Sequence, residues 1–177
     1  MARMDLDQFW QHIARSRVGY DPARAEGNMD AQLKALAAAL EPLAAEELVA
    51  FRDHFEDCMD RAHSGDLWSA AYLLAGGCSD DGFADFRSWL ISMGREVYKA
   101  ALGEPDTLAG PAHAPGVEDV FFAELRHVAG EVYQQRMGQD MPDYAGIRSA
   151  EPRSPGSDDD SYLQQRFPDL WSARRQS

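Results

Sequence analysis

The residues best suited to chemistry lie in one short stretch, Cys78-Ser79-Asp80-Asp81, which follows a pair of glycines. Two neighbouring carboxylates can serve as general acid and base, or hold a divalent cation or a cationic ligand. A thiol beside the start of a helix can have a lowered pKa, which makes Cys78 a candidate nucleophile. His63 can assist proton transfer, although a helix end also favours a histidine as a purely structural cation. The candidate catalytic residues are therefore Asp81, Asp80, Cys78 and His63.

The same stretch suits a binding cleft. Trp68 and Trp89 can form its floor, and Arg87 can orient a ligand between the carboxylates. Helix starts usually attract anions, so two aspartates at such a position argue against a phosphate site and favour a cationic or polyol ligand. The expected ligand-binding residues are Asp66, Trp68, Asp80, Asp81, Arg87, Trp89 and Arg95.

A purely structural interpretation competes with both. Ser79 is a good helix N-cap, and Asp80 and Asp81 in the first turn complement the helix dipole. The glycine pair allows a tight corner, in which Cys78 would be a small buried side chain. Both interpretations remain open at this point.

His54 and Cys58 stand one helical turn apart, a spacing that can bind a metal ion. Acidic helices supply such pairs without any metal, so we expect neither a metal site nor a cofactor. Phosphate-binding loops, dinucleotide fingerprints and zinc-protease motifs do not occur in the sequence.

The charge balance restricts the partners. Acidic residues number 30 and basic residues 17, which gives a formal net charge of −13. Phosphate backbones and anionic membrane surfaces repel such a chain, so we expect no nucleic-acid and no membrane partner. No apolar run approaches the roughly 20 residues of a membrane helix, and the N-terminus lacks a signal-peptide core. Two free cysteines fit a reducing, cytoplasmic setting.

The apolar periodicity predicts about six helices, and no segment resembles a strand. Asp5, Asn28 and Ser79 are the expected N-caps. The stretch 104–116 is expected to form a loop because it contains three prolines and two glycines. The predicted helices span residues 5–18, 28–40, 44–62, 66–75, 79–102 and 117–137.

These elements predict a single all-α domain over residues 4–138. Residues 139–177 form an irregular tail rich in proline, glycine and aspartate. Its end, residues 162–171, carries several large apolar side chains, which would be a liability in a free tail. We therefore expect that end to dock on the domain.

A distinctive motif crosses the candidate site: Gly76-Gly77-Cys78-Ser79-Asp80-Asp81-Gly82-Phe83, followed by Phe86-Arg87-Ser88-Trp89-Leu90-Ile91. This motif resembles the signature of the DUF4240 family, and the resemblance covers residues 4–138. It implies an all-α bacterial protein, but no activity and no catalytic residues. One departure is Ala44-Ala45, where relatives tend to place a capping serine or threonine. The flanking similarity lies in Phe51-Arg52-Asp53-His54-Phe55, Asp66-Leu67-Trp68, Gly94-Arg95-Glu96-Val97-Tyr98 and, more loosely, Phe167-Pro168-Asp169-Leu170-Trp171.

The expected function is a non-catalytic binding or regulatory module for a protein or small ligand, in a monomer or a homodimer. The alternative is a small-molecule enzyme or metal-binding protein that uses the carboxylates of the Cys78-Ser79-Asp80-Asp81 corner.

Overall fold

A computed structural model describes residues 3–146 and 158–174, and this part of the chain contains helices and no strand. The all-α prediction is confirmed, but six helices are too few. The α-helices are α1 (Leu6–Ser16), α2 (Asn28–Leu40), α3 (Ala45–Arg61), α4 (Gly65–Ala75), α5 (Asp80–Ser92), α6 (Arg95–Gly103), α7 (Val128–Met137), α8 (Asp160–Arg166) and α9 (Pro168–Arg174). The 3-10 helices are η1 (Pro105–Ala109), η2 (Pro111–His113) and η3 (Ala123–His127).

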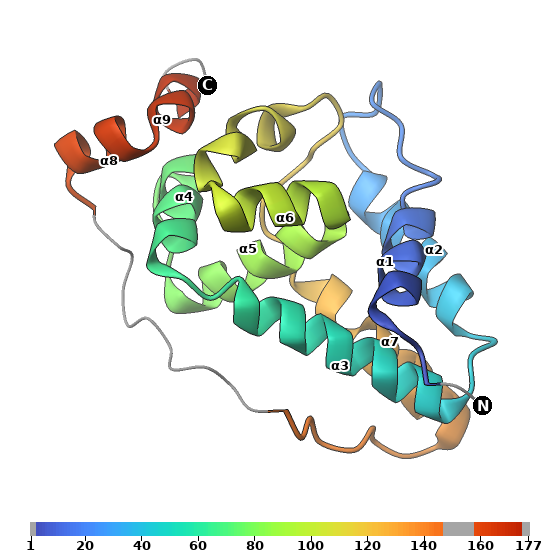
Figure 1. Cartoon of the computed structure of the whole chain (residues 1–177). Helices are drawn as coiled ribbons and strands as arrows, with labels where there is room; N and C mark the ends of the chain where they lie inside the picture. Colours follow the sequence, from blue (N-terminus) through green and yellow to red (C-terminus); the bar gives the residue numbers. More distant parts are fainter. Residues whose placement is uncertain (1–2, 147–157, 175–177) are drawn as a thin grey trace.

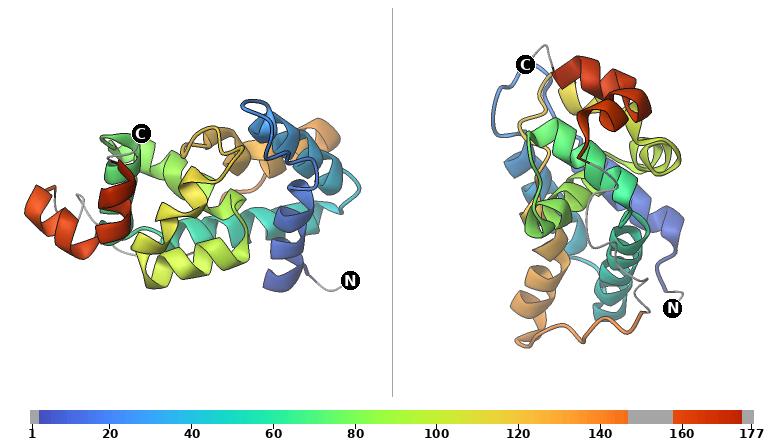
Figure 2. Two further views of the ribbon diagram at one scale, coloured as in Figure 1. Left: turned by 90° about the horizontal axis from the view of Figure 1, so that it is seen from above. Right: turned by 90° about the vertical axis from the view of Figure 1, so that its left-hand side faces the viewer.

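Helix α3 runs across the molecule, and the other helices lie along it and at its two ends (Figure 1). Helix α7 packs along its N-terminal half, while α1 and α2 pair beside that end. Helices α4, α5 and α6 gather at the other end, and α8 and α9 lie beyond α4 (Figure 2). No helix within residues 3–146 and 158–174 has the length and apolar character needed to cross a bilayer.

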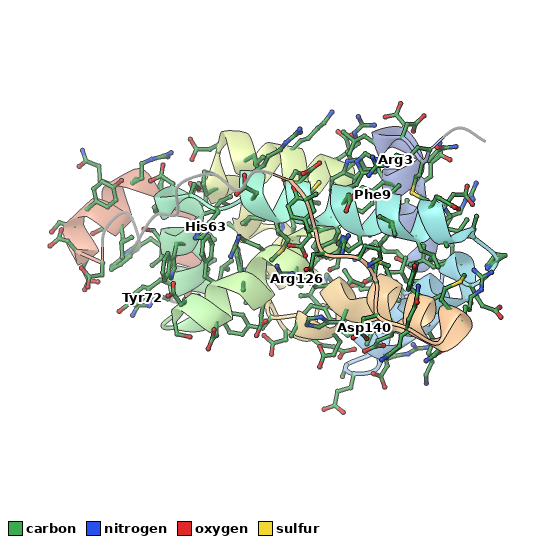
Figure 3. The ribbon with its side chains drawn as sticks, turned by 90° about the horizontal axis from the view of Figure 1, so that it is seen from below. Arg3, Phe9, His63, Tyr72, Arg126 and Asp140 are labelled. Carbon is green, nitrogen blue, oxygen red and sulfur yellow. The ribbon has the colours of Figure 1, made fainter. Side chains whose placement is uncertain are left out.

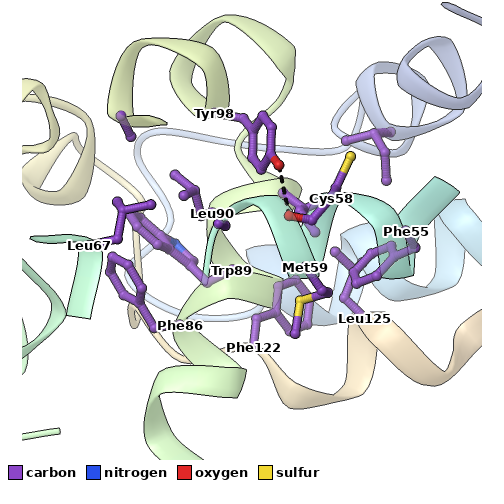
Figure 4. Packing of buried hydrophobic residues seen from close by; sticks show 14 of the residues in the cluster. Phe55, Cys58, Met59, Leu67, Phe86, Trp89, Leu90, Tyr98, Phe122 and Leu125 are labelled. Carbon is purple, nitrogen blue, oxygen red and sulfur yellow. Dashed lines mark hydrogen bonds between the residues drawn. The ribbon is translucent and has the colours of Figure 1, made fainter. Parts of the chain in front are cut away.

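The core is rich in aromatic side chains that the helical periodicity directs inward. Phe9 contacts Phe51, with ring centroids 4.9 Å apart, and Phe86 contacts Trp89 at 5.4 Å. Tyr98 donates a hydrogen bond of 2.7 Å to the backbone oxygen of Cys58, which joins α6 to α3 (Figure 4). The core therefore extends without a break from α1 to α5 and α6.

The caps predicted from sequence are partly confirmed. Asp5 forms a capping box with Gln8, and the Ser79 hydroxyl accepts from the backbone N–H of Gly82 at 3.2 Å. Ala44 has no capping side chain, and the Glu47 carboxylate accepts from its backbone N–H instead. The prediction for Asn28 is wrong, because Gly27 is the N-cap of α2 and the Asn28 side chain bonds elsewhere.

The single helix predicted over 79–102 is wrong. The chain breaks at Gly94, whose φ of +98° is not helical, and two helices result. The last carbonyl group of α5, on Ser92, accepts from the side chains of Arg17 and Gln32, both at 3.0 Å. Partners outside the helix thus replace the intrahelical bond that would have continued it.

The helix predicted over 117–137 is also wrong in its first half, because α7 starts only at Val128. Polar partners satisfy the non-helical backbone there: the Asp119 carboxylate accepts from the N–H of Val120, and Phe122 N–H donates to the carbonyl of Asp85. Within the predicted 104–116 loop, η1 and η2 are short helical turns. The first helix is shorter than the predicted 5–18, because α1 ends at Ser16, and Val18 beyond it is 84% exposed.

Candidate functional site

A polar cleft of about 240 Å³ lies between the C-terminal half of α3 and the start of α5. We call it the acidic cleft, and Figure 3 shows two of its residues, His63 and Arg126. Four residues predicted from sequence line it together, namely His63, Asp80, Asp81 and Arg87. The complete lining is Glu56, Met59, Asp60, His63, Asp80, Asp81, Arg87 and Arg126.

Local sequence positions these side chains. Glu56 and Asp60 lie one helical turn apart near the end of α3, and His63 follows just beyond the helix, so the three side chains line the cleft together. Ser64 then caps α4, accepting from Leu67 N–H at 3.2 Å, which turns the chain sharply after His63. The Ser79 hydroxyl caps α5, so the carboxylates of Asp80 and Asp81 take no part in capping.

The aspartates of the first turn of α5 are the exposed acidic edge of the cleft. Within residues 3–146 and 158–174, no hydrogen-bond or ion-pair partner holds the carboxylate of Asp80 or Asp81. Further along the same helix, the pKa of Asp85 is raised by burial and by the charges of Glu124 and Asp81. The potential around the start of α5 is therefore negative.

Both arginines of the cleft are held by fixed partners. Arg87 donates to the backbone oxygens of Met59 at 2.9 Å and of Phe83 at 3.3 Å, and its guanidinium lies over the Phe83 ring. Arg126 forms a bidentate pair with Glu56, with both N–O distances at 2.7 Å. The hydrogen bond to Glu56 raises the pKa of Arg126, which outweighs the opposing effect of burial. These cations stabilise the walls of the cleft.

Four predicted binding residues lie outside the cleft lining. Trp68 donates through Nε1 to the carbonyl of Cys78 at 2.9 Å and is nearly fully buried, and Trp89 is part of the core. Asp66 pairs with Arg166 at 3.1 Å, and Arg95 pairs with Asp7 at 2.6 Å. The aromatic floor expected from sequence is thus core packing that supports the corner from behind.

Cys78 differs from the nucleophile that its position suggested. Burial and the charge of Asp85 raise the pKa of its thiol to about 11, whereas a helix N-terminus was expected to lower it. Its Sγ points to the Ser79 carbonyl at 3.6 Å, and the residue does not line the cleft. Desolvation of the thiolate outweighs the helix dipole here.

The raised pKa predicts slow alkylation of Cys78. At pH 7.5 the thiolate fraction is small, so iodoacetamide is expected to label Cys78 at least tenfold more slowly than an unstructured cysteine, and faster as the pH approaches 11. Cys58 is 3% exposed and should react only after denaturation. Mass spectrometry of timed reactions measures both rates. Rapid labelling of Cys78 at neutral pH would contradict this account and restore it as a nucleophile.

The residues considered as metal ligands have other roles. His54 Nε2 lies 2.9 Å from the carbonyl of Met4, and Cys58 is buried with its pKa raised to about 11 by desolvation. No group of three potential metal ligands occurs in the part of the chain that the structure describes.

Sequence reasoning missed Glu56, Asp60 and Arg126. Glu56 is 9% exposed, although it lies on an acidic helix, and its carboxylate pairs with Arg126 from η3. The available signal was the helical spacing of Glu56, Asp60 and His63. Nothing in the sequence links this face to Arg126, because 70 positions separate Glu56 from its partner.

Comparison with known proteins gives one family. Residues 4–135 match the family model described as "Protein of unknown function (DUF4240)". The match includes the whole acidic cleft. No curated protein and no solved structure matches the chain. The match spans most of the chain, so the protein belongs to the DUF4240 family.

Proposed function

We propose that the protein is a non-catalytic binding module whose acidic cleft receives a cationic group, such as a lysine or arginine side chain of a basic protein partner. The observation that carries the proposal is the unpartnered pair Asp80 and Asp81 at the edge of a cleft whose own arginines are already held. A cation entering the cleft would gain partners without breaking an existing ion pair.

The charge of the cleft supports a cation over an anion. Four carboxylates, on Glu56, Asp60, Asp80 and Asp81, surround two arginines, and Asp85 adds a fifth carboxylate nearby. The formal net charge of −13 would also speed the approach of a basic partner at low ionic strength.

Two features favour binding over catalysis. Cys78 has a raised pKa and lies outside the cleft lining. The Ser79 hydroxyl is occupied by the N–H of Gly82. Covalent catalysis needs an activated nucleophile beside a base, and neither residue offers this arrangement.

Spermidine and L-arginine amide are suitable cationic probes. Each is expected to raise the melting temperature of the wild-type protein, with a shift that shrinks as salt is added. The double variant Asp80→Asn, Asp81→Asn should bind them at least tenfold more weakly, measured by calorimetry. The affinity should fall because the two free carboxylates supply the attraction.

Asp30→Asn is the matched control, because Asp30 is also an exposed aspartate in the first turn of a helix, α2, and does not line the cleft. It removes the same interaction with a helix dipole and should leave probe affinity unchanged. Equal probe affinity in the wild type and the double variant would overturn the proposal.

A further inference from the structure

The C-terminal helices lie on a surface separate from the acidic cleft. We call residues 158–174 the arm, and the face made by α4, Glu104 and η1 the arm groove. Figure 1 shows α8 and α9 beyond α4, at one end of the molecule. Leu163, Phe167 and Leu170 of the arm are at most 1% exposed, so the arm adds three fully buried side chains to the core.

Specific polar contacts fix the arm in its groove. Arg166 lies between two carboxylates, with Nη2 3.1 Å from Asp66 and Nη1 2.6 Å from Glu104. The Asp106 carboxylate accepts from the backbone N–H groups of Leu170 at 2.9 Å and Asp169 at 3.1 Å. The groove therefore binds three features of the arm: a positively charged side chain, the backbone N–H groups at the start of the following helix, and large apolar side chains.

The arm lies outside the residues that match the family model, which end at 135. Residues up to Gly146 lie on the domain, where Met141 packs against the core and Tyr144 donates a hydrogen bond to Asp57. Eleven residues, 147–157, therefore connect the domain to the arm, and they can span roughly 40 Å when extended. The main contacts of the arm with the rest of the protein are those of α9 with α4 and η1. Chain length therefore does not restrict the arm to the groove of its own molecule.

We propose that the arm groove is an exchangeable docking site, and that its second occupant is the arm of another copy of this chain. Every copy carries the same arm and the same groove, so reciprocal exchange preserves each contact and closes a two-fold dimer. The covalent connection gives the arm an effective concentration near its own groove on the order of millimolar. The wild-type protein is therefore monomeric at micromolar concentration and exchanges arms when concentrated.

Two full-length variants test the exchange without competition from the chain's own arm. The arm variant carries Phe167→Ala, which removes a fully buried anchor and leaves the groove intact. The groove variant carries Asp66→Arg and Glu104→Arg, which place positive charge against Arg166 and leave the arm intact. Asp66 and Glu104 have side chains 41% and 50% exposed, so the body of the groove variant should keep its fold.

Sedimentation velocity then measures assembly. Each variant alone is expected to be monomeric, and an equimolar mixture at 50 to 100 µM (about a tenth of the millimolar effective concentration) should contain a one-to-one heterodimer. The matched control adds Arg166→Asp to the groove variant, which restores opposite charges within one chain and should abolish the heterodimer.

A mixture that stays monomeric would overturn the proposal, and so would a heterodimer that persists with the control. Far-UV circular dichroism establishes that each variant is folded. If Phe167→Ala unfolds the protein, Arg166→Asp replaces it as the arm variant, because the Arg166 side chain is 32% exposed and its loss leaves the apolar anchors in place.

Discussion

Replacing Arg126 with methionine is expected to lower the free energy of unfolding by about 3 kcal/mol. Glu56 has a side chain only 10% exposed, and Arg126 supplies two hydrogen bonds of 2.7 Å to its carboxylate. Methionine fills much of the same volume but offers no donor, so a nearly buried carboxylate loses its bidentate partner. Urea denaturation of the variant and the wild type measures the difference.

A double-mutant cycle distinguishes the stabilisation by the Glu56–Arg126 ion pair from the cost of leaving the Glu56 carboxylate buried without that partner. Glu56→Gln combined with Arg126→Met should recover part of the stability, because the amide is cheaper to bury than the carboxylate. The control is Arg95→Met, which breaks the exposed pair with Asp7 and should cost less than about 1 kcal/mol. Equal losses for Arg126→Met and Arg95→Met would show that the Glu56 pair does not stabilise the cleft wall.

The parts of the fold that depend on neighbouring residues were predictable from the sequence. Helices α1 and α3 follow from their apolar spacing, and the caps at Asp5 and Ser79 involve only residues three positions away. The breaks that were missed depend on distant partners. Arg17 and Gln32 bind the carbonyl of Ser92, and periodicity carries no information about contacts of that range.

In the candidate site, too, the residues that are near in sequence were predictable and those that are distant were not. Asp80, Asp81 and Arg87 lie on one helix, and His63 precedes a tight turn, so the sequence placed them near one corner. Arg126 reaches the cleft because the chain between Val117 and Phe122 is not helical and η3 packs against α5. Trp68 and Trp89 were misassigned because a helical stripe looks the same whether it lines the core or a cleft.

The non-helical segment 117–122 follows a glycine whose backbone conformation other residues rarely adopt. Gly116 has φ +85°, and a Cβ at that position would lie 2.8 Å from Asn28 Nδ2, 2.8 Å from the Tyr20 hydroxyl and 2.9 Å from the carbonyl oxygen of Asp21. These atoms already form a hydrogen-bonded cluster, in which Asn28 Nδ2 donates to the carbonyls of Asp21 and Gly116, both at 2.9 Å.

The same cluster caps α2. The Glu118 carboxylate, two residues after Gly116, accepts from the backbone N–H groups of Asn28 and Met29. A shift of the chain at Gly116 would thus disturb the start of α2 and the path of the chain toward Arg126.

Gly116→Ala is therefore expected to lower the free energy of unfolding by about 3 kcal/mol, from the left-handed backbone conformation and the three close contacts together. For a protein of this size that corresponds to a fall of roughly 6 to 12 °C in the melting temperature. Differential scanning calorimetry measures it.

Gly130→Ala is the matched control, because Gly130 lies within α7 and a Cβ there meets nothing within 4 Å. Alanine at that position should raise stability by about 0.5 to 1 kcal/mol. An unchanged melting temperature for Gly116→Ala would mean that the backbone at this position relaxes freely and that the close contacts cost nothing.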